Sequence, residues 1–413
     1  MQHIKYLNGY SESGLKEGSY ISLLDEAKAC LPDYKGYTGW MNPLKYAADE
    51  NLKRIEEKSA EIRRGCDAFV IVGVGGSNNA ARAMIEAFDG GPGPEIIYSG
   101  NSTSPAAIKK VLKKLDGKKS IHVNVIAKNF ETLEPGVSFR VLREYLQKRY
   151  GNGTSSRISA TGTRGSRLEE LCLQNGWDFF LFPDDVGGRY SMYTDVALLP
   201  LAVAGLDIRS YIQGAVDARK ELLENDSPAL RYAYTRHCLY EKGFKAEILS
   251  CFDPRMEYFF RWWIQLFGES EGKNSRGLLP VACMFSEDLH SMGQFLQDGS
   301  TAVFETMLQT KEDEDDIRIA SDEMSDGFSY LDGKSFSDLN SAASQAAFLA
   351  HSTHIPCNRL SVGKVSEYTF GYLYMFFALV CVYSCRMAGV NPFDQPGVED
   401  YKKNMFRILG KEA

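Results

Sequence analysis

Four segments of the 413-residue chain place ionisable residues among glycines or prolines, and these residue types can carry acid–base chemistry. Glu269 follows an apolar helical segment, where partial loss of water favours a carboxylate that acts as a base. His290 and Lys402 can exchange protons with a substrate, and Arg189 can stabilise an oxyanion because its positive charge is permanent. Each of these residues can also have a purely structural role. Glu269 can be a solvated acid at a helix end, and His290 can be a structural histidine. Lys402 can be a solvated lysine on a helix, and Arg189 can belong to a surface ion pair.

Two turns that connect a strand to a helix can bind an anion. In the first, Gly73–Ser77 (GVGGS), glycines let backbone N–H groups and the helix dipole face an anion, and Ser77 adds a hydroxyl donor. Asn78 stands where the dinucleotide fingerprint has its third glycine, so that motif is absent, and a tight turn without a ligand is the alternative. The second is Lys128–Thr132 (KNFET), in which Thr132 can instead be a plain helix N-cap. The two turns adjoin only if their strands are neighbours.

Together these segments supply a carboxylate base, a histidine, a lysine, an arginine and two anion sites. This inventory fits proton abstraction next to the carbonyl group of a phosphorylated sugar. The net charge of -7 at pH 7 argues against nucleic acid as a partner, because such a partner requires a basic stripe. A phosphorylated substrate remains open, since a few local lysines and arginines are enough to bind one.

The elements that must position these residues alternate between strands and helices in the first half of the chain. The expected strands are Ala68–Val74, Glu95–Tyr98, Ser120–Ala127, Arg157–Ala160 and Phe179–Phe182. The expected helices are Lys45–Arg64, Asn79–Phe88, Glu134–Tyr150 and Arg164–Asn175. This alternation predicts a parallel sheet with helices on both faces.

The second half repeats this pattern less clearly. Helices are expected at Ala229–Tyr240, Met256–Phe267 and Gly397–Leu409, a strand at Leu278–Phe285, and a solvated acidic loop at Glu312–Asp316. The length of the chain favours two domains of ~100–200 residues each, and we place their boundary near Leu206. The prediction is therefore a two-lobed α/β protein.

One apolar stretch, Phe370–Cys385, is nearly long enough to span a bilayer, which takes ~20 residues. It contains three tyrosines, and Glu367 and Arg386 lie close outside it, so a helix buried in a globular domain is the better interpretation and no membrane partner is expected. The start of the sequence has no secretory signal pattern, and the nine cysteines lack the paired spacing of metal sites. We expect a cytoplasmic protein with reduced thiols and no metal.

Five motifs occur in an order that resembles the glucose-6-phosphate isomerase family in its shorter, bacterial-like form. They are GVGGS (73–77), VGGRYS (186–191), GESEGK (268–273), DLHSMGQ (288–294) and NPFDQPGVEDYKKNMF (391–406). The resemblance implies two doubly wound, three-layer αβα sugar-isomerase domains in a homodimer whose active sites lie between subunits. The chain then divides into an N-terminal extension (1–45), a first domain with the phosphate loops (46–205), a second domain (206–390) and a C-terminal segment with its helix (391–413).

The resemblance also implies the role of each candidate residue in the isomerisation of glucose 6-phosphate and fructose 6-phosphate. Glu269 would move a proton between C2 and C1 through a cis-enediol(ate), and Arg189 would stabilise that intermediate. His290, supplied by the partner subunit, would open the sugar ring together with Lys402. The implied substrate-binding residues are Gly76, Ser77, Lys128, Asn129, Thr132, Gly188, Gln265 and Gln395. No metal and no organic cofactor is implied.

The second phosphate loop departs from the family pattern, Ser-Lys-(Ser/Thr)-x-Thr-Thr. Here Ala127 and Asn129 lack the expected hydroxyls, and Glu131 adds a negative charge beside a dianion. A lost hydrogen bond to a charged group costs ~1.5–3 kcal/mol, so two losses predict phosphate binding weaker by roughly 100-fold or more, unless the Asn129 amide compensates. Two alternatives therefore stand beside the first: an isomerase with shifted sugar-phosphate specificity, or a non-catalytic sugar-phosphate binding protein.

Overall fold

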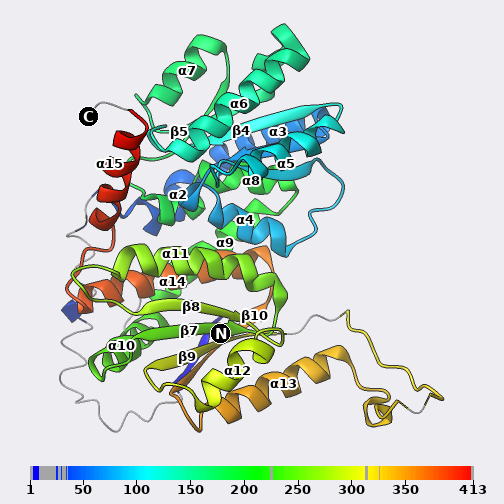
Figure 1. Ribbon diagram of the computed structural model, residues 1–413, viewed down its shortest axis with the longest axis vertical. Coiled ribbons are helices and arrows are strands. Elements are labelled where there is room, and N and C mark those ends of the chain that lie inside the picture. The colour runs from blue at the N-terminus through cyan, green and yellow to red at the C-terminus, as the bar shows by residue number, and fades with distance from the viewer. Residues whose placement is uncertain are drawn as a thin grey trace.

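The computed structural model describes residues 3–8, 25–26, 29, 34, 36–223, 227–311, 315–324 and 326–410. The chain forms two lobes, each built around a five-stranded sheet with helices on both faces (Figure 1). The predicted fold class, α/β with two doubly wound parallel sheets, is confirmed, apart from one antiparallel strand at the edge of the second sheet.

The first sheet has the strand order β3-β2-β4-β5-β6 and is parallel throughout. Its strands are β2 (Ala68–Val72), β3 (Glu95–Ser99), β4 (Ile121–Ile126), β5 (Ile158–Gly162) and β6 (Asp178–Leu181). Its helices are α3 (Asp49–Gly65), α4 (Asn79–Ala87), α5 (Pro105–Asp116), α6 (Leu133–Tyr150), α7 (Arg167–Asn175) and α8 (Asp195–Ala204). Along β2, Val70 packs in the core beneath α5 and α6 while Phe69 packs in the core beneath α4 and α8. The continuous apolar run is thus a strand buried on both faces, as predicted.

The predicted helix Lys45–Arg64 is wrong at its start. Lys45 lies in a separate short helix, α2 (Pro43–Tyr46), and α3 begins only at Asp49. Ala48 between them has an extended backbone, with φ -64° and ψ 157°, which interrupts the helical hydrogen bonds. The break turns Lys45 towards the first lobe, where it contacts Asp185.

The second sheet has the order β1-β10-β9-β7-β8, and β1 alone runs antiparallel to its neighbour. Its strands are β1 (Lys5–Asn8), β7 (Ala246–Cys251), β8 (Leu279–Met284), β9 (Val303–Lys311) and β10 (Cys357–Lys364). Its helices are α9 (Ile208–Leu222), α10 (Pro228–Glu241), α11 (Glu257–Glu271), α12 (Leu289–Asp298), α13 (Phe336–His351), α14 (Glu367–Met387) and α15 (Glu399–Ile408). The sequence did not predict β1, β7, β9, β10, α9, α12 or α13 here, nor α5 and α8 in the first lobe. Of the predicted acidic loop, Asp315 and Asp316 are exposed, and 312–314 lie outside the described residues.

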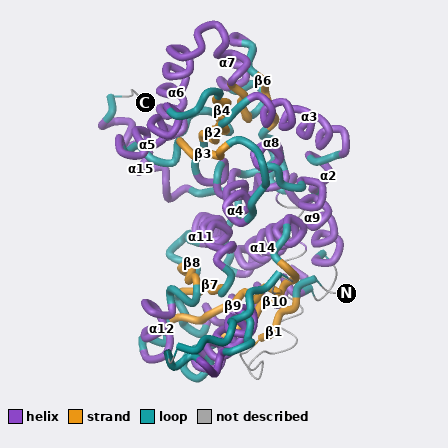
Figure 2. Tube along the Cα trace, turned by 90° about the vertical axis from the view of Figure 1, so that its right-hand side faces the viewer, coloured by secondary structure: helices purple, strands orange, loops and turns teal. Residues whose placement is uncertain are grey.

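A shared layer of helices joins the two lobes. Figure 2 shows α4, α11 and α14 between the two sheets, and a single hydrophobic core runs through this layer. Among the described residues, α14 is the one helix long and apolar enough to cross a membrane, and 89% of its most apolar 18-residue window is buried inside the protein. The predicted buried helix at Phe370–Cys385 is therefore confirmed.

Candidate active site

The site lies where the strands of the first sheet end. β2 pairs with β4, so the turn Gly73–Ser77 after β2 and the loop Lys128–Thr132 after β4 adjoin at the carboxyl edge of the sheet. Parallel α/β sheets bind their ligands at this edge. The tertiary structure therefore supplies the adjacency that the sequence left open.

Arg189 is at the centre of the site, and its side chain is only 4% exposed. Its five N–H donors all have acceptors. Nε donates to Ser270 Oγ at 2.8 Å, Nη1 to Glu269 Oε2 at 3.0 Å and Gln395 Oε1 at 2.8 Å, and Nη2 to the carbonyl oxygens of Pro392 at 2.7 Å and Asp394 at 2.9 Å. One guanidinium thus joins three segments that are far apart in the sequence, and it is no surface ion pair.

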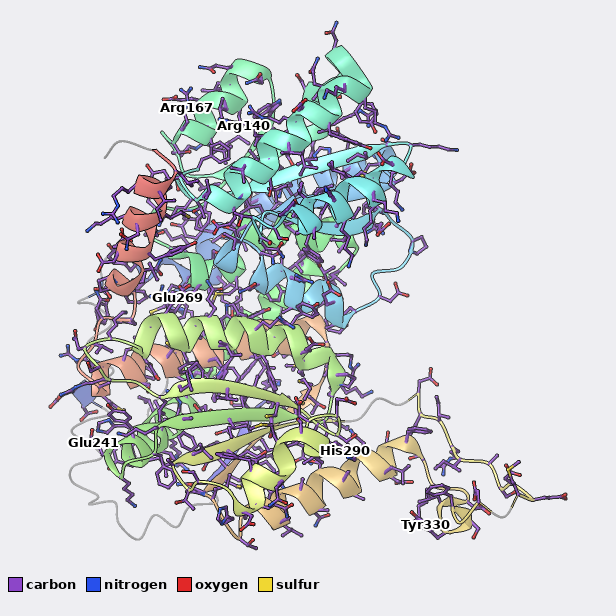
Figure 3. All side chains as sticks on the ribbon, in the orientation of Figure 1. Arg140, Arg167, Glu241, Glu269, His290 and Tyr330 are labelled. Atoms are coloured by element: carbon purple, nitrogen blue, oxygen red, sulfur yellow. The ribbon has the colours of Figure 1, made fainter. Side chains whose placement is uncertain are left out.

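The carboxylate of Glu269 is oriented by hydrogen bonds on both of its oxygens. It lies in the last turn of α11, between the two lobes (Figure 3), and its side chain is 33% exposed. Oε2 accepts from Arg189, and Oε1 accepts from Gln265 Nε2 at 3.0 Å. Gln265 in turn accepts from Asn79 Nδ2 at 2.8 Å, which fixes the orientation of its amide. A partly exposed, held carboxylate of this kind can take up a proton from a bound substrate.

The two glycines assigned to substrate binding lie against each other. A Cβ on Gly76 would lie 2.1 Å from the carbonyl carbon of Gly188, so no side chain fits there. Gly75 has φ +58°, a conformation that favours glycine, and a Cβ on it would lie 2.9 Å from Gln265 Nε2. Close backbone approach thus explains why this turn consists of glycines, and it brings Ser77 beside the Arg189 segment.

The comparisons with known proteins agree with this geometry. Residues 51–412 match the family model of phosphoglucose isomerase. A relative from Shouchella clausii, described as glucose-6-phosphate isomerase, is 44% identical over 100% of this chain and 96% of its own length. One from Staphylococcus saprophyticus with the same description is 41% identical over 91% and 88%.

The chain belongs to the phosphoglucose isomerase family. The resemblance inferred from the five motifs is therefore confirmed. Among solved structures, a hypothetical protein of Thermus thermophilus superposes with a TM-score of 0.89 at 26% identity, covering 95% of this chain and 96% of that one. A glucose-6-phosphate isomerase from Chlamydia trachomatis has the same fold, with a TM-score of 0.83 at 18% identity over 99% and 89%.

Lys128 is bonded to the protein itself. Its Nζ donates to the carbonyl oxygens of Asp184 and Val186, at 3.0 Å each. Burial lowers the pKa of its ammonium group, while the carboxylates of Asp184 and Asp185 act in the opposite direction. Lys128 therefore connects the second phosphate loop to the segment that leads into Arg189.

The other side chains of the second phosphate loop differ in whether they pack against the core or face solvent. Phe130 has φ +58°, and its ring packs edge-on against Phe139 in the core below α6. Asn129 and Glu131 are exposed at the edge of the sheet. Thr132 occupies the N-cap position of α6, but its side chain forms no capping hydrogen bond, so its hydroxyl remains available to a ligand.

The single chain does not bring His290 to Glu269. His290 is exposed on α12, and α11 and α12 pack on opposite faces of the second sheet, as the separation of the labelled residues in Figure 3 shows. Lys402 lies on α15, is 43% exposed, and pairs with Glu399 at 2.8 Å. One chain therefore assembles the carboxylate, the arginine and the two glutamines, and leaves its own His290 on the other face of the second sheet.

The structure adds residues that the sequence analysis missed. Successive positions at the end of α11 point about 100° apart, so Glu269, Ser270 and Glu271 leave the helix in different directions. The first two bind Arg189, and Glu271 pairs with the fully buried Arg236. Trp262, two turns earlier on α11, donates its indole N–H to the carbonyl oxygen of Arg189 at 3.0 Å. The GESEGK motif signalled Glu269 but not the role of its neighbours.

Proposed function

We propose that this chain interconverts glucose 6-phosphate and fructose 6-phosphate, with Glu269 carrying the proton between C2 and C1. The observation that carries the proposal is the Glu269 carboxylate, held 3.0 Å from the Arg189 guanidinium within the residues that match the family model. In the open-chain aldose, Glu269 would remove the C2 proton as the electrons move onto the C1 carbonyl oxygen. Once the proton of the C2 hydroxyl has passed to the C1 oxygen, the protonated carboxyl would return its proton to C1 as the C2 carbonyl forms, which leaves the ketose.

Arg189 is suited to stabilise the enediolate in that step. Its Nε and Nη2 donors are bonded to Ser270 and to two backbone carbonyls, which hold the guanidinium in place. Its Nη1 donors face the side chains of Glu269 and Gln395. A developing oxyanion can replace these two partners without any movement of the arginine, and such preorganised donors are the most effective kind.

Ring opening would use Lys402 together with His290, which the partner subunit would supply in a homodimer. Support for the dimer comes from the segment formed by residues 315–324 and 326–336, which projects from the second lobe (Figure 1) and includes Tyr330 (Figure 3). Its apolar side chains Ile317, Tyr330 and Phe336 are 59–69% exposed in the single chain. A second copy that covers them would remove this apolar surface from water.

A cytoplasmic setting is part of the proposal. The eight cysteines within the described residues are all free thiols, which is usual in a reducing compartment.

The first experiment measures the reaction itself. Conversion of fructose 6-phosphate is coupled to an NADP-dependent glucose-6-phosphate dehydrogenase, and deuterium uptake at C2 is followed in D2O. Wild type should turn over and exchange, and Glu269→Gln should lose both while keeping its folded circular-dichroism spectrum. Ligand binding without turnover in the wild type would instead identify a non-catalytic binding protein.

The second experiment tests the shared site. Glu269→Gln and His290→Gln chains are inactive separately under the proposal, and co-refolding them gives mixed dimers with one intact site each. About a quarter of wild-type activity should return, because half of the dimers are mixed and half of their sites are intact. No recovery in verified mixed dimers would show that His290 does not cross to the neighbouring site.

A shifted substrate is the second candidate function, and the altered loop favours it. The hydroxyls expected at Ala127 and Asn129 are missing, and Glu131 is exposed where the substrate phosphate would bind. A panel of aldose and ketose phosphates, with kcat/KM measured for each, separates the two candidates. A best value on a sugar other than glucose 6-phosphate or fructose 6-phosphate would replace the first proposal by the second.

A further inference from the structure

The segment that leads into Arg189 is held at Asp185 by the N-terminal part of the chain. The Asp185 carboxylate pairs with Lys45 Nζ at 2.6 Å and accepts a hydrogen bond from the Tyr46 hydroxyl. Its carbonyl oxygen accepts from the Gly39 N–H at 3.1 Å. A Cβ on Gly39 would lie 2.5 Å from Asp185 Oδ1, so the backbone approaches the carboxylate directly.

The charge of Asp185 is maintained by these contacts. Burial works towards a higher pKa, but the hydrogen bonds from Lys45 and Tyr46 outweigh it and lower the pKa of the Asp185 carboxyl. The group is therefore ionised at neutral pH and can keep its ion pair. Its neighbour Asp184 is exposed, and no hydrogen bond or ion pair of its side chain is seen within the described part of the chain.

Such an anchor matters because two of the three residues between Asp185 and Arg189 are glycines, Gly187 and Gly188. Glycine has more backbone freedom than any other residue, so two glycines in succession leave the position of Arg189 poorly fixed unless the residues before and after this segment are held. Downstream, the ring of Tyr190 stacks on Trp40 at 5.1 Å and 22°. The N-terminal residues 39–46 thus contact the chain on both sides of Arg189, at Asp185 and at Tyr190.

We propose that Asp185 is a positioning residue for Arg189, which it fixes against Glu269 through its contacts with Lys45 and Tyr46. The inference rests on the proposed role of Arg189 in the reaction. Asp185 contacts neither Glu269 nor Gln395, so it reaches these two side chains only through the arginine, and its other charged neighbours are Lys45 and Lys128. The N-terminal segment 36–46 accordingly belongs to the catalytic framework and is more than an extension of it.

The first test compares two neutralised aspartates one residue apart. Asp185→Asn keeps the size of the side chain but removes the ion pair, and it should lower kcat about tenfold with KM changed less than about twofold, because misplacement of a catalytic group by 1 Å can cost up to about 100-fold. Asp184→Asn is the matched control and should keep wild-type kcat. Lys45→Gln removes the same ion pair by changing its more exposed partner. This variant replaces Asp185→Asn in the test if Asp185→Asn does not fold.

A double-mutant cycle separates positioning from general structural support. In an Arg189→Lys background, Asp185→Asn should lower kcat by less than about twofold further, since the arginine through which it acts is already gone. An equal tenfold loss in both backgrounds would overturn the inference, as would a wild-type kcat in a folded Asp185→Asn or Lys45→Gln enzyme. Full activity of Arg189→Lys alone would instead defeat the proposed role of Arg189, so the two failures are distinguishable.

Discussion

Replacement of Arg189 by lysine is the most direct test of how the site is built. The substitution keeps the positive charge but replaces five N–H donors on a planar fork by three on one nitrogen. In the wild type, Arg189 donates hydrogen bonds of 2.7–3.0 Å to Ser270, two backbone carbonyls, Glu269 and Gln395. A single ammonium cannot reach acceptors on all sides of this fork.

The expected magnitude follows from which contacts disappear. Loss of one preorganised donor to an oxyanion costs about 100- to 1,000-fold in kcat, or ~2.7–4 kcal/mol. The Pro392 and Asp394 carbonyls and the Ser270 hydroxyl would also lose their buried donors, at ~1–3 kcal/mol for each group left unsatisfied. Arg189→Lys should therefore lower kcat about 100-fold or more and also lower the melting temperature.

The assay is the initial rate of fructose 6-phosphate isomerisation across a range of substrate concentrations, with circular dichroism to confirm folding at the assay temperature. Arg167→Lys is the matched control, because Arg167 is an exposed arginine that pairs with Glu170 at 2.8 Å, far from the site. It should match wild type in both measurements. A folded Arg189→Lys enzyme with kcat within about fivefold of wild type would refute the view that the guanidinium stabilises the intermediate.

Three further changes probe the loops and the core. Gly76→Ala places a Cβ 2.1 Å from a backbone carbonyl carbon, so activity should be lost and the melting temperature reduced; an active alanine variant would contradict the close approach. Arg236→Met leaves two buried carboxylates without their partner and should destabilise the protein by ~3–5 kcal/mol in urea unfolding, whereas Arg209→Met, at an exposed ion pair, should cost far less. Ala127→Ser with Asn129→Thr restores two hydroxyls and should lower KM about tenfold or more; an unchanged KM would mean that the phosphate is bound elsewhere.

The sequence by itself determined the parts of this protein that obey local rules. The apolar run of β2 and the uncharged stretch of α14 predicted buried elements because composition decides whether a segment can face water. The motifs around Glu269 and Arg189 identified the residues suited to proton transfer, because reactivity depends on residue type. Boundaries were less well predicted, as the break at Ala48 shows, since a single backbone conformation ends a helix.

Only the tertiary structure decided which of these residues meet. Tyr6 of β1 bonds Asn358 across 352 positions, and Arg189 bonds Gln395 across 206, and nothing in the local sequence of either partner specifies such pairs. Lys128 had the appearance of a phosphate ligand, yet its ammonium is bonded to two backbone carbonyls. His290 is part of the same motif series as Glu269, but the second sheet separates their helices. Contacts between distant segments depend on how whole layers pack around a common core, and that packing is a property of the entire chain.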